Sequence, residues 1–164
     1  MKENVRLAIF VGVFIFSVII LFASSFIGNK ENQIFIEENK KYELAKQQMN
    51  NPETDRSIEL LMDLQEKYND NYNVLRYMGL YYGLKGDFEK GVLFTQRAVE
   101  KRPFLAKSPG FCFQFGEMLF FYGDYKNSKA YLELSLANNI QEEHKLRIQQ
   151  LIAEAEARLQ GEGK

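Results

Sequence analysis

Residues 72–88 read YNVLRYMGLYYGLKGDF, and residues 109–125 read PGFCFQFGEMLFFYGDY. Both stretches end in the same small-acidic-aromatic triplet, Gly86-Asp87-Phe88 in the first and Gly123-Asp124-Tyr125 in the second. A glycine that follows an apolar segment of helical length can take a positive φ and end the helix, and the aspartate after it can cap the next helix. Each triplet therefore predicts the turn of a helical hairpin.

The residues on either side of the two triplets also correspond at fixed offsets. Before the triplet, the matching sets are Leu75, Met78, Gly79, Tyr82 and Cys112, Phe115, Gly116, Leu119. After it, the matching sets are Gly91, Thr95, Ala98, Pro103 and Ser128, Leu132, Ser135, Ile140. A step of 34 residues back from Gly91, Thr95 and Ala98 lands on Ser57, Leu61 and Leu64. This indicates a more degenerate first copy, with its turn at Asn51-Pro52-Glu53.

This order of small and large residues resembles the tetratricopeptide repeat (TPR), a helical hairpin of about 34 residues. The resemblance implies an all-α fold, a TPR-like α-solenoid of about three helical hairpins plus a C-terminal capping helix. The repeats would cover 38–71, 72–105 and 109–142, the capping helix 143–160, and a frayed tail 161–164. The longer spacing before the third repeat predicts a loop at Phe104–Gly110. The alternative is an unrelated bundle of helical hairpins, which would keep the helices but lose the superhelical groove.

The N-terminal segment 7–27 reads LAIFVGVFIFSVIILFASSFI, 21 residues without a charge. As a helix it would be about 31 Å long at about 1.5 Å per residue, close to the thickness of a bilayer's hydrocarbon core, about 30 Å. The sequence therefore predicts a single N-terminal transmembrane helix that serves as a signal anchor. A short basic tail at 1–6 precedes it, and a linker or helix extension at 28–37 follows it.

The flanks of this segment bear on its orientation and on its processing. Lys2 and Arg6 on one side against Lys30 on the other favour a cytoplasmic N-terminus under the positive-inside rule. The expected location is a single-pass protein of a bacterial inner or plasma membrane with the TPR domain extracytoplasmic. Cleavage before Phe26 is the alternative and would release a secreted soluble TPR protein, although the apolar run exceeds the usual signal-peptide core of about 7–15 residues.

In the TPR family, the first helix of each repeat builds a concave face that binds partner segments. Carried over position by position, the resemblance predicts a groove lined by Tyr42, Met49, Arg76, Leu80, Leu84, Phe113, Glu117, Phe120 and Phe121. Apolar and aromatic side chains dominate this set, which suits an amphipathic helix or an extended apolar peptide. A clamp for a C-terminal carboxylate is not expected, because Glu117 would repel it.

The third of these first helices, residues 111–122, is apolar nearly all round. A helix of that kind is typically buried on all sides, here between its neighbours and the capping helix. The other interpretation is that Phe113, Phe120 and Phe121 exceed what packing needs and contact a partner, as exposed apolar patches do. Both interpretations stay open at the level of the sequence.

The composition excludes several classes of function. A net charge of −1, from 21 Lys and Arg against 22 Asp and Glu, argues against a nucleic-acid partner. One cysteine and one histidine exclude a disulfide and a Cys/His zinc site. Cys112 falls at a core-facing position, and His144 lies in a charged segment where a solvated side chain is expected. We expect neither an enzyme nor a cofactor or metal.

The resemblance then implies a membrane-tethered TPR adaptor or scaffold that holds a protein or peptide partner, a membrane-associated subunit. Similar bacterial proteins serve in assemblies for export, secretion or pilus formation, envelope biogenesis and cytochrome biogenesis. The alternative is a chaperone-like receptor that captures apolar segments of translocating chains, as a mitochondrial import receptor of similar layout does. A homo-oligomer, in which a twin protomer fills the groove, stays open.

Overall fold

The computed structural model describes residues 2–49 and 56–162, without the side chains of residues 2–11, 23, 25–29, 31 and 162. Within this part the chain is all-helical. The elements are α1 (Lys2–Gln48), α2 (Arg56–Lys67), α3 (Tyr72–Leu84), α4 (Phe88–Lys101), the 3₁₀ helix η1 (Pro103–Lys107), α5 (Pro109–Tyr122), α6 (Tyr125–Ala137) and α7 (Glu142–Glu162). The chain divides into two compact units, Met1–Lys41 and Tyr42–Lys164.

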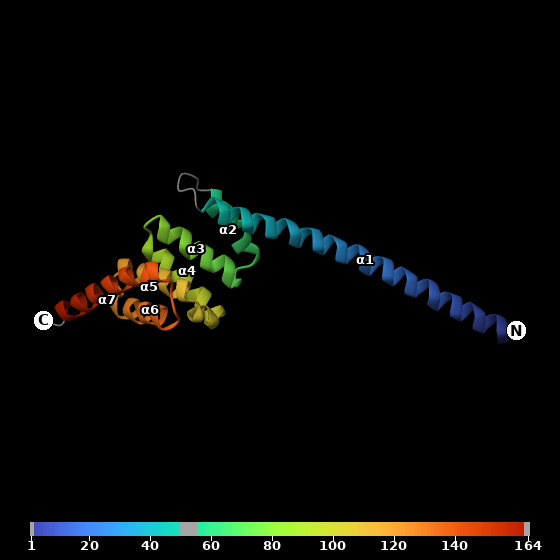
Figure 1. The fold of residues 1–164 in the computed structure, drawn as a ribbon. Helices are drawn as coiled ribbons and strands as arrows, with labels where there is room; N and C mark the ends of the chain where they lie inside the picture. The colour runs from blue at the N-terminus through green and yellow to red at the C-terminus, as the bar shows by residue number, and fades with distance from the viewer. Residues whose placement is uncertain (1, 50–55, 163–164) are drawn as a thin grey trace. The chain divides into compact units, whose positions relative to one another are not determined.

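Helices that follow one another in the second unit pack as adjacent pairs (Figure 1). The pairs α3–α4 and α5–α6 have the closest association, and α6–α7 continues the series. The arrangement is compatible with a helical-repeat solenoid, in which each hairpin contacts mainly its neighbours.

The two hairpin turns have the conformation that the triplets predict. Gly86 has a φ of +79° and Gly123 a φ of +97°, so both occupy the left-handed region that favours glycine. Asp87 and Asp124 are the N-caps of α4 and α6. Each carboxylate accepts a hydrogen bond from the backbone N–H three residues on, at 3.2 and 3.1 Å. The predictions for both turns are confirmed.

Small residues let the two helices of each hairpin approach closely. A Cβ added to Gly79 would lie 2.1 Å from Thr95 Oγ1 and 3.0 Å from the carbonyl oxygen of Gly91. At the corresponding place in the next hairpin, a Cβ on Gly116 would lie 2.8 Å from Leu132 Cγ. The hydroxyl of Ser128 donates to the Gly116 carbonyl at 2.8 Å, so the backbone of one helix is bonded directly to a side chain of the other.

The core consists of three clusters of buried side chains, each contributed by neighbouring helices. The residues that recur at the same offsets are all buried: Ser57, Leu61, Leu64, Gly91, Thr95, Ala98, Ser128, Leu132 and Ser135. Ala45, near the end of α1, joins the first cluster with Leu61 and Met78. The turn predicted at Asn51-Pro52-Glu53 lies outside the described residues.

The loop before α5 and the last helix close the two ends of the third hairpin. Residues 103–107 form η1, whose Leu105 is buried, and Ser108 then caps α5. At the other end, Ile148 and Leu151 of α7 pack with Leu132 and Ile140. The segment predicted as a capping helix at 143–160 thus covers the last hairpin, and its helix extends to Glu162.

The transmembrane helix predicted at Leu7–Ile27 is not supported and is corrected. These residues lie in α1, and no described helix is long and apolar enough to cross a membrane. The side chains of 7–11, 23 and 25–27 lie outside the description. The membrane anchor and the single-pass membrane localisation are corrected with it.

We expect Gly79→Ala to lower the free energy of unfolding by about 1–3 kcal/mol, because the added methyl group overpacks a contact with backbone atoms that cannot move aside. Urea denaturation followed by circular dichroism at 222 nm measures this. Gly110→Ala is the matched control, since an added Cβ there has no heavy atom within 4 Å and alanine favours the helix. Equal stability of Gly79→Ala and wild type would contradict the close packing.

Candidate partner-binding surface

Several predicted groove residues are partly exposed and also contact the next first helix of the series. The rings of Tyr42 on α1 and Tyr77 on α3 meet edge to face at 5.3 Å. The guanidinium of Arg76 on α3 lies 5.6 Å from the ring of Phe111 on α5. Phe113 on α5 lies 5.1 Å from the imidazole of His144 on α7. The same turn of each first helix therefore supports the helix that follows, and α7 takes the place of a fourth first helix.

Three more of the predicted residues also contact a neighbouring helix. Glu117 accepts hydrogen bonds from Arg147 Nε at 3.1 Å and Nη2 at 3.0 Å, which joins α5 to α7. Phe120 is half-buried against the cluster around Leu132 and Ile148. Leu80 adjoins α5 beside Phe111, where the remaining gap has a volume of about 10 Å³. These positions make contacts within the protein, and their role in binding a partner stays a prediction.

Burial changes the chemistry of one of these residues. Desolvation, followed by the neighbouring Tyr77, raises the pKa of the Tyr42 hydroxyl above its usual value. Tyr42 therefore stays neutral and acts as a packing and hydrogen-bonding group. The imidazole of His144 lies against the ring of Phe113, and 39% of its side chain remains exposed to solvent, as expected for a side chain in a charged segment.

Two of the predicted residues remain available to a partner. Leu84 is 64% exposed and Phe121 is 50% exposed. They stand at the C-terminal ends of α3 and α5, immediately before the hairpin turns, and Phe121 stacks on Phe88 of α4 at 5.2 Å. Tyr122, also 50% exposed, directly follows Phe121 in the sequence. We call these residues, Leu84, Phe88, Phe121 and Tyr122, the turn-end surface. Met49 is half-buried at the end of α1.

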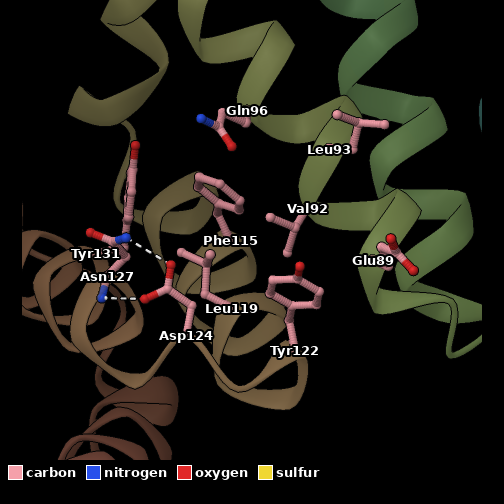
Figure 2. A pocket seen from close by; sticks show the side chains of 10 residues that line it. All are labelled: Glu89, Val92, Leu93, Gln96, Phe115, Leu119, Tyr122, Asp124, Asn127 and Tyr131. Carbon is pink, nitrogen blue, oxygen red and sulfur yellow. Dashed lines mark hydrogen bonds between the residues drawn. The ribbon is translucent and has the colours of Figure 1, made fainter.

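A hollow of about 410 Å³ opens between α4, α5 and α6, next to the turn-end surface (Figure 2). Its floor consists of Val92, Phe115 and Leu119, which are buried. The remaining lining residues are Glu89, Leu93, Gln96, Tyr122, Asp124, Asn127 and Tyr131. The volume falls within the range of about 300–1,000 Å³ that is usual for ligand pockets.

Charge and aromatic groups give the hollow a definite chemistry. Glu89 and Asp124 are its two ionisable carboxylates, and none of the lining residues is Lys, Arg or His. Asp124 accepts from the backbone N–H of Asn127 at 3.1 Å and from its amide Nδ2 at 2.7 Å. The ring of Tyr131 meets Phe115 edge to face at 4.6 Å, and burial raises the pKa of its hydroxyl. The hollow is therefore an apolar floor with an acidic, aromatic rim.

The sequence reasoning did not find this hollow. The TPR resemblance directs attention to first helices, whereas this site depends on the second helices α4 and α6. One signal was present: Glu89, Leu93 and Gln96 recur at helical spacing on one face of α4, beside the buried Val92. What the sequence could not supply is the separation between α4 and α6.

No described group of three or more His, Cys, Asp or Glu side chains is placed to hold a metal ion. Cys112, the residue with nucleophilic potential, is fully buried and its thiol donates to the Ala106 carbonyl at 3.1 Å. Burial raises the pKa of the Cys112 thiol, which disfavours the reactive thiolate.

Neither the family models nor the curated proteins with which the sequence was compared include a match to this chain. The repeat geometry and the surface chemistry therefore carry the functional argument.

Two adjacent phenylalanines should respond differently to truncation. Phe120→Ala should lower the free energy of unfolding by about 2–4 kcal/mol, because it leaves a cavity between α5 and α7. Phe121→Ala should cost about 1 kcal/mol or less, because half of its ring is already in solvent. Urea denaturation of both variants measures this, and equal losses would contradict the assignment of Phe121 to an open surface.

Cys112 should resist alkylation as long as the hairpin is folded. We expect iodoacetamide at neutral pH to modify the native chain at least about 100-fold more slowly than the chain unfolded in urea, because reaction requires local opening. Mass spectrometry over a time course gives both rates. A native rate equal to that of the unfolded chain would place the thiol at the surface.

Proposed function

We propose that this chain is a TPR-like, non-enzymatic adaptor that binds a protein partner with its helical-repeat unit. The observation that carries the proposal is the repetition of one hairpin design. Gly79 with Thr95 and Gly116 with Leu132 make the same close contact, and Gly86-Asp87 and Gly123-Asp124 make the same turn. Repeats of this kind stack into an extended surface, which helical-repeat proteins use to bind other proteins.

The finer assignment to the TPR pattern rests on residue types at fixed positions. The second repeat has Gly79, Ala98 and Pro103 at the expected offsets, and the third has Gly116. Gly91 and Ser128 depart from the usual alanine, and Thr95 departs from the usual large residue. Their shared small size still suits the close helix contacts in which they lie.

The turn-end surface is the part of the repeat unit that best suits a protein partner. Leu84, Phe121 and Tyr122 are large apolar or aromatic side chains that are at least half exposed. Aromatic side chains with a polar tip, such as Tyr122, are enriched at binding hot spots because they bury a large area at low entropic cost. Protein partners therefore match this surface better than small hydrophilic ligands.

A photo-crosslinking amino acid placed at position 84 or 121 of the full chain tests the proposal in cells of the source organism. We expect the same partner to be attached from both positions, because both side chains are exposed at the ends of first helices, immediately before hairpin turns. Position 146 on α7 is the matched control, since Leu146 is 67% exposed, close to the 64% of Leu84. Absence of any adduct from positions 84 and 121, or equal adducts from all three positions, would contradict the proposal.

A further inference from the structure

We propose that the hollow between α4, α5 and α6 binds a lysine or arginine side chain of the protein partner, next to an apolar residue that contacts the turn-end surface. This inference rests on the proposed function and adds the chemistry of the partner to it. It assigns a binding role to the side of the second helices, which the predicted groove did not include.

Charge complementarity is the first argument. Glu89 and Asp124 both lie at the hollow, and the lining holds no cationic side chain. Glu89 lies in the first turn of α4, and Asp124 caps α6, so each carboxylate faces a helix N-terminus worth about half a positive charge. The two carboxylates contribute two negative charges, and the two helix N-termini together contribute about one positive charge. The hollow therefore keeps a net charge of about −1. A cation is therefore attracted, and an anionic segment is repelled.

The aromatic walls provide the second argument. Phe115 stands between Tyr131 and Tyr122 in the close-up view, and all three rings border the hollow (Figure 2). The negative face of such a ring attracts a cation, and the attraction grows as water is excluded. The buried floor of Val92 and Leu119 suits the aliphatic stem of a lysine or arginine, which packs on apolar surface while its charged head remains polar.

A metal ion fits these groups less well than a side chain does. Hard cations such as Ca²⁺ take six to eight oxygen ligands, whereas both carboxylate oxygens of Asp124 already accept from Asn127. The apolar floor offers no further oxygen. An organic cation needs only the negative field, the rings and the apolar contact.

The charge at the position of Glu89 differs in the next hairpin. By the correspondence of the two triplets, the position of Glu89 in α4 is occupied by Lys126 in α6. The equivalent place one hairpin further along thus has the opposite charge. This difference distinguishes the hollow from the place one hairpin further along the chain.

Selection of peptides on the full chain tests the inference. A displayed library of random 12-residue peptides is selected on immobilised wild-type chain, and the most enriched peptide becomes the probe. We expect it to contain Lys or Arg beside a large apolar residue. Replacing that cation with norleucine, which keeps the stem and removes the charge, should weaken binding about 10-fold. Raising NaCl from about 0.05 to 0.5 M should weaken the cationic probe and not the norleucine probe.

Variants of the hollow locate the contact. Glu89→Gln and Asp124→Asn should each weaken the cationic probe about 3–5-fold, and the double variant should bind both probes equally. Asparagine keeps the helix cap, so Asp124→Asn preserves the fold. Glu59→Gln, also in the first helical turn of a second helix but remote in sequence from the hollow, is the matched control and should bind as wild type. Circular dichroism melts verify that all variants are folded.

The outcomes separate this inference from the proposed function. Enriched peptides that lack a cation, or a cationic probe that binds the double variant as tightly as wild type, would overturn the inference and leave the adaptor function standing. Displacement of the probe by submillimolar spermidine would assign the hollow to a small polyamine in place of a protein side chain. If no peptide is enriched above background, the adaptor function fails, and the inference fails with it.

Discussion

The close approach of two helix backbones at Gly79 and Gly91 is the constraint on which the second unit depends. The gap holds no Cβ at Gly79, because the Thr95 hydroxyl and the Gly91 carbonyl already occupy the space. Glycine lowers helix stability by about 1 kcal/mol relative to alanine, so two helical glycines are a local cost. The cost is offset by tertiary packing, since the close contact lets Leu75, Val92 and Ala98 join one buried cluster.

Contacts with aromatic rings also connect successive hairpins. Tyr42, Arg76 and Phe113 each contact an aromatic ring on the next first helix. The guanidinium of Arg76 on α3 lies 5.6 Å from the ring of Phe111 on α5, so a cation–π contact joins these two repeats without a buried ion pair. This arrangement avoids the desolvation cost of burying two opposite charges. A first helix as apolar as α5 is stable here because α6 and α4 pack closely against it, and η1 and α7 add further contacts.

The sequence allowed prediction of the local structure and of much of the hairpin packing. Turn glycines, capping aspartates and buried second-helix positions depend on short-range rules, and Gly86, Asp87 and Ser128 obey them. Outward-facing residues were harder to assign, because repeat positions such as Phe113 and Glu117 can face a partner or the next helix. The decision depends on whether another helix follows, and α7 occupies that place. The apolar run at 7–27 shows a further limit, because composition alone predicted a membrane span that the described part of α1 does not support.

The loops that connect the helices explain why the hollow is present. Between α4 and α5 the chain makes the longer loop that contains η1, and η1 packs against α4, α5 and α6 at that end of the hairpins. Leu105 is buried there and fills the space between the helices. At the opposite end each hairpin closes on itself through Gly86 or Gly123, so no connecting residue enters the same space. The hollow extends from the middle of the three helices to the turn end, where the first turn of α4 and the cap of α6 bring Glu89 and Asp124 to its rim. The same feature that positions the third hairpin thus leaves an acidic site beside the exposed rings of α5.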